Sequence, residues 1–434
     1  MTLLIISPDY ASHLLPLATL GTAWLEAGER VVVATGPATA SIVESFGFER
    51  VDLQLGKGSN PGIIRAEDQP TGEDDALRGF FAATRVGMVE TLAFQAEARL
   101  SDLMWEPVRV AREVQRVVAE LAADSIIVDH LAFSARLALV AARVPYADVV
   151  LGHPSALPVG DEVYGYPPAW PAAFRPGASE LERLHELCTR VSESFTAEWN
   201  AALAELDPSA APAVDAFKEH GELLMLNYPE ELGDPARTAL LPRHVFLGSA
   251  VRDEVVDDGV LAWIASSPDP FVYVSFGSFL SVRADVLRRV AGALAALGLR
   301  AAIAIGSADR SELGDLPASW LVREFLPQVT LLRSAAAAVT HGGNNSVTEA
   351  MTFGVPLVVL PFSTDQFAGA AALESTGHGV ALAPNTASVD DLAAAITTVL
   401  GFSRTPLVQV AGRTLAFDAL ARERIVATSD DASR

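Results

Sequence analysis

The sequence predicts an α/β protein built from two Rossmann-like halves, each a doubly wound parallel sheet covered by helices. Its 434 residues exceed the length that one hydrophobic core usually supports. In both halves, short apolar runs alternate with stretches of helical apolar spacing. Residues 229–242 combine three prolines with mixed charges, as linkers between domains do. We therefore expect a first domain over residues 1–228, a connector over 229–250, a second domain over 251–428 and a frayed tail over 429–434.

The first half opens with a strand, a helix and a second strand. Residues 2–7 (TLLIIS) are apolar throughout, as in a buried strand. Residues 13–27 show helical apolar spacing that ends at Gly28, and residues 31–35 form the next apolar run. The other elements expected in this half are a helix over 77–105, a strand over 125–129 that ends in an acid, a helix over 132–143 and a strand over 223–226.

The second half repeats this alternation. The expected elements are a strand from residue 271 that runs into Gly277-Ser278, a helix over 283–297, a strand over 300–305, a strand over 336–340, a helix from 345 onward and a strand over 357–360. The turn His341-Gly342-Gly343 joins the last of these helices to its strand. Because the first backbone N–H groups of a helix have no partner within it, this unit predicts a site for a diphosphate.

The residue types around this turn fit such a site. Gly342 and Gly343 allow close approach of the backbone to a ligand. Asn345 and Ser346 are expected to cap the helix and to donate hydrogen bonds to phosphate oxygens. Glu349 lies one turn further on the same face, where a carboxylate suits the diol of a ribose. The sequence therefore predicts that phosphate and ribose bind side by side.

The same segment resembles a known signature. Residues 341–349 have the spacing H-x-G-x-N-S-x-x-E, and the following Asp365-Gln366 offers two acceptors and an amide donor to a sugar. This pattern resembles the donor-binding signature of the UDP-glycosyltransferase superfamily, and residues 325–328 (FLPQ) resemble its W-x-P-Q. The resemblance implies an inverting enzyme of the GT-B fold, in which two Rossmann-like domains face each other across a cleft, similar to bacterial natural-product and macrolide glycosyltransferases.

The resemblance also implies a set of donor-binding residues in the second half. Phe325 stands where many members place a Trp that stacks on the base, and Asn344 replaces a Trp that is common in plant members. Phe still stacks on a pyrimidine, with less area. Gly277-Ser278 resembles a second turn that contacts phosphate. The donor-binding residues expected are Gly277, Ser278, Phe325, Gln328, His341, Gly343, Asn344, Asn345, Ser346, Glu349, Asp365 and Gln366.

A candidate general base lies near the start of the chain. His13 opens the predicted helix in the pattern H-x-x-P, which is similar to the catalytic histidine motif of the family. A helix N-terminus disfavours the imidazolium form, so we expect His13 to be neutral and able to accept a proton. In the family, an aspartate at the position of Asp129 holds the other ring nitrogen. From the residues alone, His13 also fits a surface group or a cap, and Asp129 also fits a cap for the next helix.

Acceptor recognition is expected in the first half, because the donor signature occupies the second. One group of apolar side chains recurs at helical spacing within residues 77–105, where ordinary core packing is an equal alternative. A second group lies in a Pro-rich loop, and exposed aromatic side chains need a cover, which a hydrophobic small molecule provides. The acceptor-binding residues expected are Phe80, Phe81, Met88, Tyr164, Tyr166 and Trp170.

Charge and cysteine content limit the partners and the compartment. The net charge of −23 disfavours binding to nucleic acid or to an anionic membrane, which needs clustered Lys and Arg. A single cysteine, Cys188, fits a reducing compartment. The apolar start lacks the basic region of a signal peptide, and no apolar run is long enough to span a membrane. We therefore expect a cytoplasmic protein that is a monomer or a homodimer.

These observations predict an inverting glycosyltransferase that moves a sugar from a TDP- or UDP-linked donor to a hydroxyl of a hydrophobic small molecule. The helix N-terminus is expected to stabilise the leaving diphosphate, so we expect no metal and no cofactor beyond the nucleotide sugar. A dinucleotide oxidoreductase is excluded because residues 7–13 contain no glycine, and the chain lacks the Asp-x-Asp of metal-dependent transferases. A sugar-nucleotide epimerase on the same scaffold and a non-catalytic activator of such transferases remain alternatives.

Overall fold

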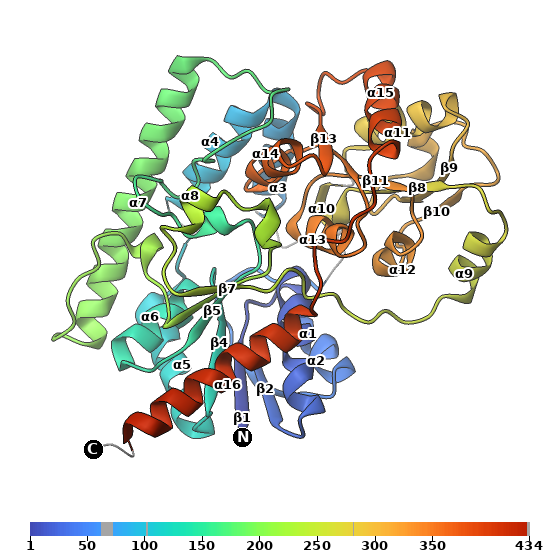
Figure 1. Cartoon of the computed structure of the whole chain (residues 1–434). Coiled ribbons are helices and arrows are strands. Elements are labelled where there is room, and N and C mark those ends of the chain that lie inside the picture. Colours follow the sequence, from blue (N-terminus) through green and yellow to red (C-terminus); the bar gives the residue numbers. More distant parts are fainter. Residues whose placement is uncertain (62–72, 101–102, 281, 432–434) are drawn as a thin grey trace.

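The protein consists of two α/β units, each built around one parallel sheet (Figure 1). A computed structural model describes residues 1–61, 73–100, 103–280 and 282–431. Within these residues the alternation of strands and helices confirms the predicted architecture of two Rossmann-like halves. None of the helices in this part of the chain is long and apolar enough to cross a membrane.

The first sheet has the strand order β3-β2-β1-β4-β5-β6-β7, and every pair of neighbours is parallel. Helices cover both faces of the sheet, so its central strands are apolar along their whole length, and the side chains of residues 3–6 are fully buried. The strands are β1 (Thr2–Ile6), β2 (Arg30–Thr35), β3 (Glu49–Asp52), β4 (Ser125–Asp129), β5 (Ala147–Val150), β6 (Leu223–Leu226) and β7 (His244–Phe246).

The first helix shows how local sequence sets an element. Leu14, Leu17 and Ala18 lie on one face of α1 and are completely buried against the sheet. The helix stops where Gly28 adopts a φ of +76°, as predicted from the sequence. The helices up to the connector are α1 (Ala11–Glu26), α2 (Ala40–Ser45), α3 (Glu73–Val86), α4 (Met88–Arg99), α5 (Pro107–Leu121), α6 (Phe133–Ala142), α7 (Ala178–Leu206) and α8 (Pro235–Thr238).

The second sheet is also parallel throughout, with the order β10-β9-β8-β11-β12-β13. Its strands are β8 (Phe271–Ser275), β9 (Arg300–Ala304), β10 (Leu321–Arg323), β11 (Ala337–Thr340), β12 (Leu357–Val359) and β13 (Gly379–Ala381). The remaining helices are α9 (Asp258–Ala265), α10 (Gly277–Leu280), α11 (Ala284–Ala296), α12 (Gln328–Leu332), α13 (Asn344–Thr352), α14 (Gln366–Ser375), α15 (Val389–Leu400) and α16 (Gly412–Asp431). Short 3₁₀ turns occur at Pro37–Thr39, Pro154–Ala156, Ala216–Lys218, Glu230–Leu232 and Arg310–Leu313.

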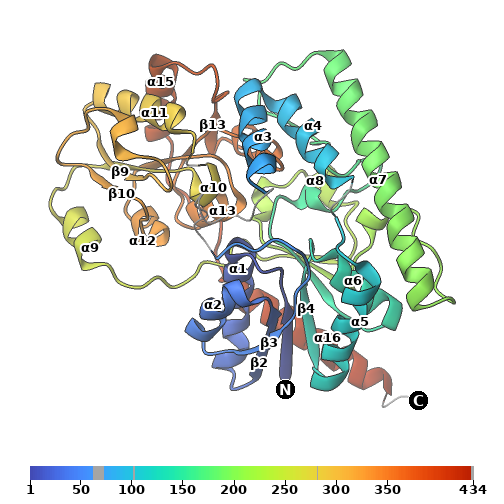
Figure 2. The same cartoon turned by 180° about the vertical axis from the view of Figure 1, so that it is seen from behind.

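Two segments, β7 and α16, pack on the first unit although the predicted domain boundaries place them outside it. The expected connector contains β7, which extends the first sheet by pairing with β6. The chain then returns at its end, because α16 crosses back from the second unit and lies along α1 (Figures 1 and 2). Apolar burial explains this return, since Ala416 and Leu420 join the core beneath the first sheet. The frayed tail was expected over residues 429–434, but residues 429–431 belong to α16; residues 432–434 lie outside the described part of the chain.

The single helix predicted over residues 77–105 is instead a pair, α3 and α4, with the break at Gly87; residues 101–102 lie outside the described part of the chain. Helix α3 belongs to the first half by sequence but packs on the second unit (Figure 2). Phe80 is buried in the core of that unit, and the buried Arg283 donates from Nη1 to the carbonyl oxygen of Thr84 at 3.1 Å. The two units are therefore joined by the helix pair as well as by the connector and α16.

Candidate active site

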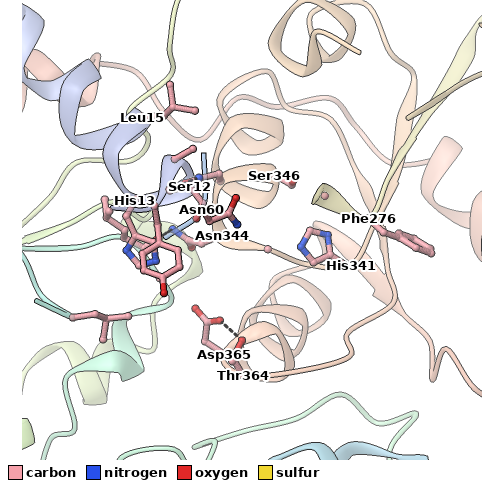
Figure 3. A pocket seen from close by; sticks show the side chains of 18 of the residues that line it. Ser12, His13, Leu15, Asn60, Phe276, His341, Asn344, Ser346, Thr364 and Asp365 are labelled. Atoms are coloured by element: carbon pink, nitrogen blue, oxygen red, sulfur yellow. Dashed lines mark hydrogen bonds between the residues drawn. The ribbon is translucent and has the colours of Figure 1, made fainter. Parts of the chain in front are cut away.

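A cavity of about 1090 Å³ lies between the two units and is lined by residues from both. Its walls come from the start of α1, the carboxyl ends of the central strands and the turns that follow β8 and β11. Ligands of open parallel sheets bind at this edge, because the connecting loops open there. Figure 3 shows Ser12 and His13 on one side of this space and Ser346 and His341 on the other, with Asp365 between them.

The two residues predicted to form a catalytic pair meet in this cavity. Asp129 is the last residue of β4, and His13 lies in the first turn of α1, the helix that follows the neighbouring strand β1. His13 Nδ1 lies 2.7 Å from Asp129 Oδ2, and Asp129 Oδ1 accepts the backbone N–H of Leu131 at 2.8 Å. With the Nδ1 proton directed at the carboxylate, Nε2 is the ring nitrogen that carries a free lone pair.

The pKa of His13 is shifted in the opposite direction to the shift expected from the helix N-terminus. Burial lowers the pKa of His13, but the charge and hydrogen bond of Asp129 and the charge of Asp365 outweigh burial, so the pKa is raised above its ordinary value. The helix N-terminus was expected to keep the imidazole neutral. The nearby buried carboxylate dominates instead, because only 1% of Asp129 is exposed and solvent screens it little.

The opposite wall carries the predicted anion site at the start of α13. The helix begins at Asn344, one residue earlier than predicted, and its N-cap is Gly343, which offers no side chain. Asn345 and Ser346 were expected to cap the helix, but no side-chain cap is present. Both lie in the first turn and line the cavity, so the backbone N–H groups of this turn have no side-chain acceptor and face the space between the units.

The two asparagines in this turn bridge the units. Asn344 Nδ2 donates to the carbonyl oxygens of Leu151 at 2.7 Å and Asn227 at 2.9 Å, which follow β5 and β6. Asn345 Nδ2 donates to the carbonyl oxygen of Ser12 at 3.2 Å. Asn344 lines the cavity, as expected of a donor-binding residue, while its amide nitrogen donates to the first unit.

His341 occupies the turn before α13 and is wedged between two glycines. A Cβ added to Gly343 would lie 2.5 Å from its Nε2, and one added to Gly277 would lie 3.1 Å from its Cε1. Gly277 also has a φ of +69°, which favours glycine. Burial lowers the pKa of His341 to about 4, so the ring is neutral near pH 7. The side chain of Ser278, predicted beside Gly277, lies outside the described residues.

Glu349, predicted to read a ribose, lies behind the cavity wall. Only 2% of its surface is exposed, and it does not line the cavity. Its Oε2 accepts Gln328 Nε2 at 2.6 Å, and its Oε1 accepts Arg252 Nη1 at 3.1 Å. Gln328 and Arg252 line the cavity in its place, and Gln328 Oε1 accepts the hydroxyl of Ser346 at 3.2 Å. Burial raises the pKa of Glu349, although Arg252 and Gln328 oppose this effect.

Of the residues predicted to stack on the base or bind the sugar, two line the cavity and one does not. Phe325 lines the cavity and is 65% exposed, which leaves its ring face open to a ligand. Asp365 also lines the cavity, and its Oδ2 accepts the backbone N–H of His153 at 2.6 Å. Gln366 does not line it, because its Oε1 accepts the backbone N–H groups of residues 362 and 363 and thereby holds its own loop. Gln366 is thus a structural residue of the turn in this arrangement.

Two of the six predicted acceptor residues line the cavity. Tyr164 and Tyr166 do so from the loop that precedes α7. Met88 is buried against α7, and Phe81, like Phe80, packs in the core of the second unit. These three residues follow the core-packing alternative, because helical apolar spacing marks any buried face. Trp170 packs at the edge of the α7 core and does not line the cavity.

Two arginines in the lining were not predicted. Arg252 lies just after the connector among acidic residues, and Arg99 is the last residue of α4. In sequence, each resembles an ordinary surface charge, the first paired locally and the second at a helix C-terminus. No local signal separates them from other surface arginines, because their orientation depends on segments far away in the chain.

Comparisons with known proteins agree with this geometry. The family model described as UDP-glucoronosyl and UDP-glucosyl transferase matches residues 189–403. An L-demethylnoviosyl transferase of Streptomyces niveus is 34% identical over 149 residues, which are 33% of this chain and 39% of its own length. An oleandomycin glycosyltransferase of Streptomyces antibioticus is 27% identical over 205 residues, 46% of each chain. The matched region spans about half or less of the length of these curated relatives.

Solved structures resemble the whole architecture. The spinosyn forosaminyltransferase SpnP has a TM-score of 0.64 and 18% identity, covering 98% of this chain and 99% of its own. The spinosyn rhamnosyltransferase SpnG, solved with thymidine diphosphate, has a TM-score of 0.62 and 19% identity, covering 99% of this chain and 100% of its own. At these identities the likeness establishes the shared GT-B fold, with two Rossmann-like domains and a cleft between them.

Proposed function

We propose that this chain, whose residues 189–403 match the family of UDP-glucoronosyl and UDP-glucosyl transferases, transfers a sugar from a nucleoside-diphosphate donor to a hydroxyl of a hydrophobic small molecule, with inversion at the anomeric carbon. One observation carries the proposal. A histidine oriented by a buried carboxylate and an uncapped helix N-terminus face the same cavity from opposite units. A proton acceptor and an anion site placed in this way suit a displacement in which a diphosphate leaves.

The reaction proceeds in one displacement. His13 Nε2 accepts the proton of the acceptor hydroxyl while the hydroxyl oxygen forms a bond to the anomeric carbon. The bond from that carbon to the diphosphate oxygen breaks, and its electron pair leaves with the diphosphate. Asp129 stabilises the imidazolium that forms, as its 2.7 Å contact with Nδ1 allows. The attacking oxygen and the leaving group lie on opposite faces of the carbon, so an α-linked donor yields a β-linked product.

The donor is held by the second unit. The N–H groups at the start of α13 and the hydroxyl of Ser346 stabilise the diphosphate, because a helix N-terminus carries partial positive charge. These donors take the place of a cation, so we expect the reaction to need no metal. Phe325 stacks on the base with its exposed ring, and Asp365 contacts the sugar.

The nucleotide is thymidine or uridine diphosphate. Two relatives of this fold, SpnG and VinC, were solved with thymidine diphosphate or dTDP, which supports a thymidine donor. The relatives named for oleandomycin and spinosyn support a natural product as the acceptor.

Turnover of a donor panel against an acceptor library tests the proposal. We expect TDP- or UDP-sugars to be consumed only when a hydroxylated acceptor is present, and NMR of the product to show the inverted anomeric configuration. His13→Ala serves as the inactive variant and His244→Ala as its matched control, since His244 lies on the edge strand β7 away from the cavity. Consumption of the donor without any acceptor would indicate an epimerase, and absence of turnover with the whole panel would favour the non-catalytic activator.

A further inference from the structure

The acceptor side of the cavity contains a cation that the proposed reaction does not use. Arg99 ends α4 and lines the cavity together with Tyr164 and Tyr166. Within the described residues, no carboxylate forms an ion pair with its guanidinium group, whose contact is with the Tyr164 ring at 5.2 Å from the centroid. Arg252, the other arginine in the lining, pairs with Glu349 and Glu254. In the part of the chain that the structure describes, Arg99 is thus a cation without an acidic partner.

The surroundings of Arg99 are rigid. Tyr164 is 9% exposed, and its ring stacks on Phe217 at 3.9 Å with an angle of 6° between the planes. Phe133 packs against both of these rings edge to face. The next residue, Gly165, has a φ of +85°, and a Cβ there would lie 3.0 Å from Arg99 Nη1. The fixed ring and the bare glycine leave one defined place for the guanidinium group.

An ordinary structural role explains this arrangement less well. Arginine at the end of a helix often interacts with the last carbonyl groups and the helix dipole. In the described part of the chain, however, Arg99 donates no hydrogen bond to these carbonyls, and its guanidinium lies over an aromatic ring in the cavity wall. The orientation of the Arg99 guanidinium group toward the cavity indicates that it binds a ligand there.

The charges in the cavity indicate what that ligand carries. Of the three carboxylates in the lining, Asp129 and Asp365 accept hydrogen bonds from His13 and from the backbone N–H of His153. The third, Glu324, follows β10 in the second unit, and among the described residues none of the three forms an ion pair with Arg99. A partly buried cation is stabilised when an anion is bound to it, and a planar guanidinium suits a carboxylate through two parallel hydrogen bonds.

We propose that Arg99 binds a carboxylate of the acceptor, so that the acceptors of this enzyme are hydroxylated aromatic or polyketide acids. This inference rests on the proposed function for the meaning of the cavity, but the binding it describes requires no sugar transfer. The apolar walls hold the carbon skeleton, Arg99 holds the acid at one end, and the hydroxyl at the other end is presented to His13.

Equilibrium binding of two fluorescent probes tests this proposal. The probes are 6-hydroxy-2-naphthoate and its neutral amide, 6-hydroxy-2-naphthamide, titrated against the wild type, Arg99→Gln, Arg99→Lys and a control, Arg109→Gln. Arg109 is a surface arginine that pairs with Glu106 and Glu113 outside the cavity. We expect the wild type to bind the carboxylate about 10- to 100-fold more tightly than the amide, the range for a hydrogen bond to a charged group.

The variants separate binding from folding. Arg99→Gln should lose this preference while it keeps the affinity for the amide, which also reports an intact cavity; Arg99→Lys should keep part of the preference, and Arg109→Gln all of it. Equal affinities of the wild type for the two probes, no binding of the carboxylate, or a preference that survives in Arg99→Gln would overturn the proposal. If Arg99→Gln does not fold, the affinities of the wild type and of Arg99→Lys for the two probes test the proposal. If the preference for the carboxylate depends on Arg99 but no donor is turned over, the proposed glycosyl transfer is rejected and the carboxylate site at Arg99 stands.

Discussion

Asp129→Asn isolates what the buried carboxylate contributes to the reaction. The substitution keeps the size of the side chain and removes the charge that faces His13 Nδ1 at 2.7 Å. Asp129 is 1% exposed, so solvent and salt screen this contact little. A hydrogen bond to a charged group contributes about 1.5–3 kcal/mol. If the contact stabilises the imidazolium in the transition state, turnover falls by a factor of about 10–150. His13→Ala removes the base itself and should lose about 10²–10⁴-fold.

The pH dependence gives an independent readout. His13 accepts a proton only when it is neutral, so kcat/KM falls as the pH drops through its pKa, which Asp129 and Asp365 raise above the ordinary value. In Asp129→Asn one of these charges is lost. We therefore expect the acid limb of the profile to move to lower pH while the plateau falls. His13→Ala should abolish the limb.

Initial rates across the pH range, with product quantified by chromatography, provide the assay. Asp124→Asn is a matched control, because Asp124 immediately precedes β4 at the opposite end of the same strand and bonds to the backbone N–H of Thr2. This control should keep the wild-type profile. An Asp129→Asn profile with unchanged plateau and unchanged acid limb would refute the catalytic pair, and aggregation with complete loss of rate would assign Asp129 a role in the fold.

Three further predictions concern the donor side. Gly343→Ala should weaken binding of the free nucleoside diphosphate about tenfold or more in calorimetry, because the new Cβ would lie 2.5 Å from His341 Nε2 and must displace that ring from the anion site. Unchanged affinity would mean that the phosphate site is elsewhere. Glu349→Ala removes one of the two carboxylates that pair with Arg252, so it should lower the free energy of unfolding by about 1–3 kcal/mol and weaken UDP and TDP equally. A loss of about 1 kcal/mol confined to UDP would instead show that the carboxylate reads the 2′-hydroxyl. Prior treatment with EDTA should leave the initial rate unchanged, whereas loss of rate that Mg²⁺ restores would contradict a metal-free displacement.

The parts of the site predicted from sequence are those fixed by the backbone path. Asp129 follows from an apolar strand that ends in an acid, and His13 from a helix that begins after the neighbouring strand. The carboxyl ends of parallel strands meet at one edge, so topology alone brings both residues together. The turn at Gly343 follows in the same way, because its geometry is set by the strand and helix on either side of it.

The parts that sequence did not predict depend on a choice between partners. The Gln366 amide can bind either a ligand or its own loop. Only the folded turn shows that its Oε1 accepts a backbone N–H of the loop. Glu349 faces either the cavity or a partly buried cation, and that cation, Arg252, comes from the segment between the connector and α9. Phe80 and Phe81 have the spacing of any buried helix face, and the surface that covers them belongs to the other unit. Apolar periodicity predicts that a side chain is buried, but it does not predict which part of the chain covers it.

The two asparagines at the start of α13 connect the donor site to the base. Asn345 donates to the carbonyl oxygen of Ser12, the residue directly before His13, and Asn344 donates to carbonyl oxygens beyond β5 and β6. The helix N-terminus proposed to hold the diphosphate is therefore attached, through its own first turn, to the turn that carries the proposed base. These hydrogen bonds fix the position of the anion site relative to the proton acceptor, on which the geometry of the displacement depends. Substitution of the Asn345 amide consequently affects the orientation of the base as well as the binding of the donor.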